Sequence, residues 1–258
     1  MGTNETIIPR ETLLKELDSF KKWSGPFLVK ILADIPKYGS NPVPLGSGGL
    51  VKYKNRYFVL TNAHVVNNND ISDLVKEINI PYTFEDNSYK MTILEAYKDS
   101  QADIAIFEIR YNENILKSNH QFLEVNNIEH DIPAFVDMTN IVFLQGYPFY
   151  STTIDNVAKE ITAETLPYCT FVESFDETVN SLYLITDSTG IDENGNEVEL
   201  SHFGGISGSF VYGYYIDENS SYKCLGVVTN WHRADSLLEV YPMNEFLDFI
   251  ERKFFHVE

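Results

Sequence analysis

The sequence predicts an all-β protein of two packed lobes with a helix at each end. The chain has 258 residues, of which 43% are hydrophobic and 14% aromatic, so it can bury a sizeable core. Short runs rich in Val, Ile, Tyr, Phe and Thr recur between turn residues, a spacing typical of strands. The polar stretch Asn112–Phe135 interrupts this pattern and is the best boundary between the lobes. We therefore expect a helical extension (1–24), a first β-barrel (25–125), a second β-barrel (126–242) and a C-terminal helix (243–258).

The expected elements follow in chain order. Apolar residues at three- and four-residue spacing predict an amphipathic helix over Pro9–Trp23. Strands are expected in the first half at Phe27–Leu32, Gly48–Tyr53, Tyr57–Thr61, Met91–Tyr97 and Ile104–Ile109. The second half repeats the pattern at Ile141–Leu144, Thr170–Val172, Leu182–Thr186, Ser209–Tyr215 and Cys224–Thr229. A hairpin tip is expected at Asp192–Glu199, and a last helix at Met243–Phe254.

Charge and composition argue against several classes of protein. The 38 acidic against 19 basic residues give a net charge of −19, which repels nucleic acid and anionic membranes. No stretch approaches 18 uncharged apolar residues, and no basic segment followed by an apolar one begins the chain, so neither a membrane span nor secretion is expected. Two cysteines, Cys169 and Cys224, are too few for a disulfide framework and are interpreted as reduced, at least half-buried thiols. A cytoplasmic location follows as the expectation.

The sequence also gives no support for a metal or a cofactor. No glycine-rich segment ends in Gly-Lys-Ser or Gly-Lys-Thr, so a phosphate-binding loop is not expected. The six histidines show no spacing with the two cysteines that is typical of zinc ligands.

Three short segments carry the chemical signal: Leu60–Val66, which contains His64, Ala102–Ile106, which contains Asp103, and Phe203–Ser209, which contains Ser207. Each lies at the edge of an apolar run, where a strand ends and a side chain can reach a cleft. A serine hydroxyl is a poor nucleophile until an imidazole takes its proton, and a carboxylate must hold that imidazole in the right tautomer. Singly, each segment is more typical of an ordinary turn, but together they predict a hydrolase site.

These segments resemble the trypsin/chymotrypsin-like serine proteases, especially the compact bacterial branch that includes the glutamyl endopeptidases. Thr61-Asn62-Ala63-His64 resembles the histidine motif of that family, Asp103-Ile104-Ala105-Ile106 its aspartate motif, and Gly205-Ile206-Ser207-Gly208-Ser209 its nucleophile loop. The chain order His, Asp, Ser is also that of the family. Further landmarks are Gly46-Ser47-Gly48-Gly49, Gly146-Tyr147-Pro148 and Gly226-Val227-Val228-Thr229. The likeness covers roughly residues 25–250.

The resemblance implies a fold and a mechanism. The fold would be two packed six-stranded Greek-key β-barrels. His64 would be the general base and then the general acid, Asp103 would orient it, and Ser207 would attack the peptide carbonyl. The backbone N–H groups of Gly205 and Ser207 would form the oxyanion hole. Where trypsin-like zymogens carry an aspartate before the nucleophile, this chain has Ile206, so activation by N-terminal cleavage is not expected.

The resemblance is less informative about specificity. It places Ser201 at the base of the primary pocket, followed by His202, and no carboxylate lies there to select Lys or Arg. Thr229 and Trp231 belong to the wall strand, and the Trp231 indole would narrow the pocket. His202 or His232 would be candidates to bind an acidic side chain, beside the alternative that both are solvated loop residues. We expect cleavage after small, medium apolar or acidic residues, with basic residues favoured a few positions away because of the net charge.

Other functions remain open at this stage. An α/β-hydrolase is rejected, because Ser207 is followed by another strand pattern rather than a helix. A pseudo-protease would use the same fold as a protein-interaction module with a silent triad. A third possibility is a dedicated activator that cuts one partner protein, similar to cytosolic bacterial proteases of defence systems.

Overall fold

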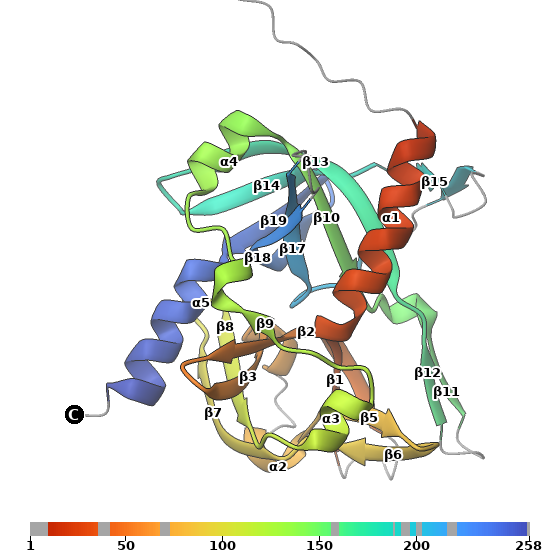
Figure 1. The fold of residues 1–258 in the computed structure, drawn as a ribbon, viewed down its shortest axis with the longest axis vertical. Coiled ribbons are helices and arrows are strands. Elements are labelled where there is room, and N and C mark those ends of the chain that lie inside the picture. The colour runs from red at the N-terminus through yellow and green to blue at the C-terminus, as the bar shows by residue number, and fades with distance from the viewer. Residues whose placement is uncertain are drawn as a thin grey trace, which may run out of the picture.

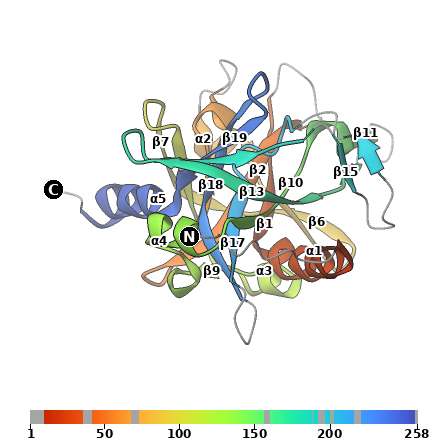
Figure 2. The same ribbon diagram turned by 90° about the horizontal axis from the view of Figure 1, so that it is seen from above.

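The computed structural model describes residues 10–35, 42–67, 73–155, 160–187, 189–191, 197–199, 203–215 and 221–256. Two β-rich lobes lie one above the other (Figure 1). A helix near each end of the chain packs on the second lobe, and the two helices lie on opposite sides of its strands (Figures 1 and 2). The mostly β architecture predicted from the sequence is confirmed.

Both predicted terminal helices are present. Helix α1 spans Arg10–Ser24 and buries Phe20 among the rings of Phe143, Tyr212 and Tyr222. Helix α5 spans Met243–Ile250 and continues as a π-helical turn, Glu251–Phe255. Its apolar face is fully or almost fully buried, because five of its eight residues point into the core.

The first lobe is one curved sheet with the strand order β4-β1-β2-β3-β8-β7. One further short strand of this sheet, β9, pairs with β2 in parallel. The strands are β1 Leu28–Ala33, β2 Val43–Tyr53, β3 Arg56–Thr61, β4 Ile78–Asn79, β7 Ile93–Asp99, β8 Ile104–Ile109 and β9 Leu123–Glu124.

The expectation of a closed six-stranded barrel in the first lobe is wrong for the described residues. Strand β4 is only two residues long and pairs with β1, and no pairing joins it to β7 in the described residues. Between β4 and β7 in the chain stands the hairpin of β5 (Pro81–Phe84) and β6 (Asn87–Lys90). Its base is closed by one hydrogen bond, from Met91 N to Ile80 O at 2.9 Å. The lobe is therefore a half-barrel sheet.

The second lobe contains the closed six-stranded barrel, in the order β10-β13-β14-β19-β18-β17. Its strands are β10 Ile141–Gly146, β13 Leu166–Asp176, β14 Ser181–Ile185, β17 Phe210–Tyr215, β18 Ser221–His232 and β19 Leu237–Pro242. Two hairpins project from it, β11 Thr152–Asp155 with β12 Glu160–Ala163, and β15 Thr189–Ile191 with β16 Glu197–Glu199. The pairing of β15 with β16 agrees with the predicted hairpin, whose tip lies outside the described residues.

Short helices occupy the polar connections. Helix α2 spans Leu74–Glu77, α3 spans Glu113–Lys117 and α4 spans Ile132–Met138. Each begins after an Asp or Asn whose side chain accepts a backbone N–H hydrogen bond, at Asp73, Asn112 and Asp131. Helices α3 and α4 lie in the stretch that separates the two sheets.

Three hydrophobic clusters hold the molecule together, one inside each lobe and one between them. The cluster between the lobes joins Phe58 and Ile106 of the first sheet to Phe210 and Val227 of the second. A Cβ built on Gly49 would lie 2.0 Å from the Phe210 ring, so only glycine lets the two sheets approach this closely. This contact holds strand β2 of the first sheet against the start of β17.

Cys169 is half-buried and Cys224 is buried, both as free thiols, and burial raises the pKa of Cys169 to about 12. No helix within the described ranges combines the length and apolarity needed to cross a bilayer.

Candidate active site

His64 and Asp103 are brought together by two neighbouring strands. Strands β3 and β8 are antiparallel, with Thr61 opposite Ala105, so the end of β3 and the start of β8 lie at the same edge. His64 follows β3 and opens a 3₁₀ turn, His64–Val66, anchored by the buried side chains of Val65 and Val66. Asp103 comes directly before β8.

The His64–Asp103 pair makes two hydrogen bonds of equal length. The His64 backbone N–H donates to Oδ1 of Asp103 at 2.8 Å, and ring atom Nδ1 lies 2.8 Å from Oδ2. Because an ionised carboxylate only accepts, Nδ1 carries the proton in the neutral form of the ring, and in that form Nε2 has the free lone pair. The imidazole side chain is 49% exposed, so Nε2 can reach a substrate. This is the tautomer that a general base needs.

The backbone around Asp103 is shaped for this contact. Its φ of +53° lies in the left-handed region, which Asp tolerates better than most residues. The turn before it is tied by Asp99, whose carboxylate accepts from the N–H groups of Gln101 and Ala102. These hydrogen bonds lower the pKa of Asp99. On the other side, the buried Asn62 donates to the Asp103 carbonyl at 3.3 Å.

Ser207 lies in the loop that precedes β17, and this loop is clamped between both lobes. On the second lobe, Gly208 N donates to Val228 O and Val228 N donates to Ser209 O, both at 2.9 Å. Gly208 has φ +89°, and a Cβ there would lie 2.0 Å from the Ser47 carbonyl oxygen on the first lobe. Only glycine fits this position.

The loop and the histidine segment meet at one residue of β2. A Cβ built on Gly46 would lie 3.1 Å from Cγ1 of Val65 and 3.2 Å from the carbonyl oxygen of Ser207. The structure thus brings together, around Gly46, the three segments that carry His64, Asp103 and Ser207.

The Ser207 hydroxyl does not reach His64 in this structure. Its hydrogen bond goes to the carbonyl oxygen of Thr229, at a long 3.5 Å, and no hydrogen bond joins it to the imidazole among the described residues. Such contacts are often loose in free enzymes and tighten when substrate binds.

Within the described ranges, two backbone N–H groups of this loop have no acceptor. The N–H groups of Ile206, Gly208 and Ser209 donate to other carbonyls, whereas those of Gly205 and Ser207 find no partner in the described part of the chain. The carbonyl of Gly204 accepts from Phe149 N, and that of Ile206 from Ser209 N, both at 2.9 Å. Because the C=O and N–H of a trans peptide point in opposite directions, the N–H groups of Gly205 and Ser207 point away from these partners. Backbone N–H groups that are free beside a serine can hold an oxyanion.

The predicted specificity residues are only partly described. Ser201 and His202 lie outside the described residues. The hydroxyl of Thr229 donates to Glu239 O at 3.2 Å, so its carbonyl rather than its side chain faces Ser207. The Trp231 ring packs edge-on against the buried Phe203, with ring centroids 5.5 Å apart.

His232 is occupied by a carboxylate of the same chain. Its Nε2 lies 2.9 Å from Oε2 of Glu239, and Oε1 of that glutamate accepts from Ser181. An acidic substrate side chain would have to displace Glu239 to use this histidine.

Sequence reasoning missed several residues that position the site. Asn62 and Asp99 shape the Asp103 turn, and Ser47 links the first lobe to the Ser207 loop. Ser47 lies in the Gly46–Gly49 motif, so its position was flagged, although its contacts were not. Asn62 lies in the Thr61–His64 motif in the same way, whereas Asp99 has no sequence signal beyond its closeness to Asp103.

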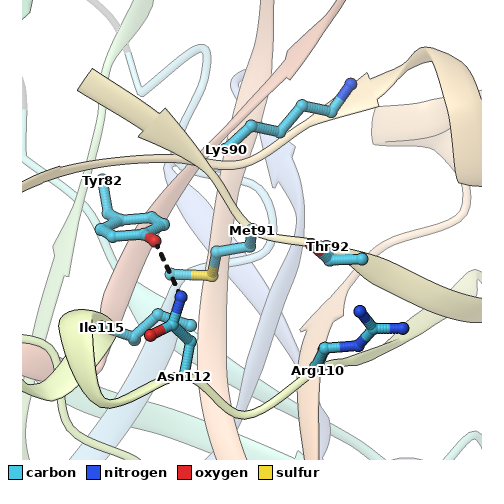
Figure 3. A pocket seen from close by; sticks show the side chains of 7 residues that line it. All are labelled: Tyr82, Lys90, Met91, Thr92, Arg110, Asn112 and Ile115. Atoms are coloured by element: carbon cyan, nitrogen blue, oxygen red, sulfur yellow. Dashed lines mark hydrogen bonds between the residues drawn. The ribbon is translucent and has the colours of Figure 1, made fainter.

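A small cavity in the first lobe lies apart from the three segments of the candidate site. It has a volume of about 40 Å³, enough for about one water molecule, and Figure 3 shows its lining residues, Tyr82, Lys90, Met91, Thr92, Arg110, Asn112 and Ile115. None of them belongs to the His64, Asp103 or Ser207 segments. In the described residues, no group of three or more His, Cys, Asp or Glu side chains is placed to hold a metal.

No family model matches the chain, and no curated protein matches it.

Proposed function

We propose that this protein is a serine endopeptidase that hydrolyses peptide bonds through an acyl-enzyme. The observation that carries the proposal is the His64–Asp103 pair, hydrogen-bonded twice at 2.8 Å, together with the Ser207 loop, in which the N–H groups of Gly205 and Ser207 have no acceptor among the described residues. A half-barrel packed on a closed six-stranded barrel is compatible with the two-barrel fold of trypsin/chymotrypsin-like proteases.

Each residue has a role in this reaction. Nε2 of His64 takes the proton from Ser207 Oγ as the hydroxyl oxygen bonds to the peptide carbonyl carbon. The carbonyl oxygen becomes an oxyanion between the N–H groups of Gly205 and Ser207. His64 then gives its proton to the leaving amine as the C–N bond breaks, and Asp103 stabilises the imidazolium in between. Water repeats the sequence on the acyl-enzyme, and no cofactor is needed.

The residue preferred before the scissile bond depends on the side chains that line the proposed substrate pocket. Trp231 fills space beside Phe203, which favours a small, medium apolar or acidic residue before the scissile bond. The net charge of −19 favours basic residues at more distant positions of a protein substrate. Cleavage of one dedicated partner protein would be a narrower form of the same endopeptidase function.

A second candidate is a pseudo-protease that binds proteins without cutting them. It is favoured by the Ser207 hydroxyl, which points to Thr229 O rather than to His64. Against it stands the His64–Asp103 geometry, which a binding module does not need.

Profiling with a peptide library separates these candidates. The intact protein and its Ser207→Ala variant are incubated with the library, and new peptide termini are identified by mass spectrometry. Cleavage by the wild type that disappears in the variant supports the endopeptidase. Cleavage that persists in the variant, or none by the wild type, contradicts it.

A further inference from the structure

Ser47 is the residue through which the first lobe holds the Ser207 loop. It lies on β2 and is fully buried. All four of its hydrogen-bonding groups are used around the site, and three of them bind the second lobe. No other described residue makes so direct a connection between the sheet that carries His64 and the loop that carries Ser207.

Two of these contacts fix carbonyls of the Ser207 loop. The Ser47 hydroxyl donates to the Gly205 carbonyl at 3.0 Å, and the Ser47 backbone N–H donates to the Ser207 carbonyl at 3.0 Å. Together with Phe149 N on Gly204 O and Ser209 N on Ile206 O, they give every carbonyl from 204 to 207 a donor.

The remaining two contacts fix the hydroxyl and the backbone carbonyl of Ser47. Tyr147 N donates to Ser47 Oγ at 2.9 Å, which directs the hydroxyl proton toward Gly205. Thr61 Oγ1 donates to the Ser47 carbonyl at 2.7 Å, so Ser47 is tied to the strand that leads to His64. The Gly205 backbone packs on the same turn, because a Cβ built there would lie 2.7 Å from Phe149 N and from Tyr147 O.

We infer that Ser47 is a positioning residue for the oxyanion hole, an inference that rests on the proposed endopeptidase function. Gly205 has φ +97° and no side chain, so its peptides can rotate unless their carbonyls are held. With the Gly205 carbonyl held by the Ser47 hydroxyl and the Gly204 carbonyl by Phe149 N, the Gly205 N–H keeps its direction before substrate arrives. Without the hydroxyl, the Gly205 carbonyl and the Tyr147 N–H lose their partner in a buried place, and the loop is free to turn.

The test compares Ser47→Ala with a matched control, Ser24→Ala. Ser24 is also buried, and its hydroxyl donates to Oε1 of Gln145 at 2.6 Å, but among the described residues it makes no hydrogen bond to the Ser207 loop. The measurements are kcat and KM on a cleaved peptide, and the affinity of a peptide boronate that forms a tetrahedral adduct with the active serine.

Ser47→Ala is expected to lower kcat by about 10-fold or more and to weaken boronate binding by a similar factor. KM should change little, because oxyanion contacts strengthen only in the transition state. Ser24→Ala is expected to keep the wild-type values. If Ser47→Ala has the kcat and boronate affinity of the wild type, the positioning role of Ser47 is overturned and the proposed function is not. A wild type that neither cleaves peptides nor binds the boronate would overturn the proposed function and this inference with it.

A second variant covers the case in which Ser47→Ala does not fold. Ser47→Cys fills nearly the same space but replaces the hydroxyl with a weaker donor. It is expected to fold and to lower both kcat and boronate affinity, but by a smaller factor than Ser47→Ala does. Wild-type kcat in a folded Ser47→Cys would overturn the inference.

Discussion

Asp103 accepts two hydrogen bonds from His64, one from the backbone N–H and one from ring atom Nδ1, each 2.8 Å long. The first fixes where the histidine backbone lies, and the second fixes the plane and the tautomer of its ring. One carboxylate thus sets both the position and the protonation pattern of the proposed general base.

Asp103→Asn is expected to lower kcat by about 10⁴-fold, the magnitude known for this change in a Ser-His-Asp protease, because an amide no longer enforces the productive tautomer. Asn also tolerates the left-handed backbone at φ +53°, so the variant should unfold at nearly the wild-type temperature. Asp103→Ala should lose activity and, unlike Asn, also thermal stability. Kinetics and thermal melts of both variants check this, and an Asn variant of wild-type activity would exclude Asp103 from the mechanism.

Trp231→Ala is expected to widen the range of residues accepted before the scissile bond. The indole packs on Phe203, and its removal leaves room for larger side chains. For peptides with Phe or Tyr at that position, kcat/KM should rise by about 10-fold or more, because each added methylene that fits is worth about 1–3 kcal/mol. Arg233→Ala is the control, since this exposed side chain also lies over the Trp231 ring. An unchanged profile in Trp231→Ala would place this residue away from the substrate.

Full activity is expected without N-terminal processing and under reducing conditions. Ile206, the residue before the proposed nucleophile, is buried in the core of the second lobe and offers no carboxylate to a new N-terminal amine. Cys169 and Cys224 are free thiols. The measurement is the cleavage rate of the protein with an N-terminal fusion, before and after the fusion is removed, in the presence of dithiothreitol. Activity that appears only after trimming or oxidation would contradict this.

Lys30→Met is expected to raise stability at pH 7, with a gain that shrinks in alkali. Lys30 is 7% exposed, donates to Thr152 Oγ1 at 2.7 Å, and burial lowers its pKa from 10.5 to about 8. Between these two pKa values the unfolded wild type binds more protons than the folded one, so wild-type stability rises with pH across this window. Below pH 8 the burial cost is present in full.

Urea unfolding of the wild type and Lys30→Met at pH 7 and pH 10 checks this prediction. The exposed Lys98→Met serves as the control, and its free energy of unfolding at pH 7 is expected to stay within about 0.5 kcal/mol of the wild type. A Lys30→Met variant that is less stable than the wild type at pH 7, or a gain that grows with pH, would show that the buried ammonium is stabilising.

The sequence predicted the elements with strong local patterns and missed those fixed by tertiary contacts. All ten predicted strands overlap strands of the structure, and the helices at Pro9–Trp23 and Met243–Phe254 correspond to α1 and α5. Strand β19 was missed because Ser236 and the polar residues before it resemble a loop, although its alternating Leu238 and Val240 close the barrel. The open first sheet was also not foreseen, since nothing local shows that β4 is two residues long.

Within the candidate site, the motifs identified the segments but not the contacts that position them. The convergence of His64 and Asp103 follows from the pairing of β3 with β8, which no short motif specifies. The contacts of Ser47 with Tyr147 and Gly205 join residues 100 and 158 positions apart, so the sequence alone gives no sign of them.

The most direct measurement of the central claim is the site of covalent labelling by a fluorophosphonate. The probe reacts with a serine only when a base has activated it, so the intact protein is labelled and the adduct is mapped by peptide mass spectrometry. The endopeptidase assignment predicts one adduct, on Ser207, that is lost in Ser207→Ala and reduced to background in His64→Ala, with both variants folded by thermal melt. No adduct on the folded wild type, or equal labelling of Ser207 in His64→Ala, would contradict it.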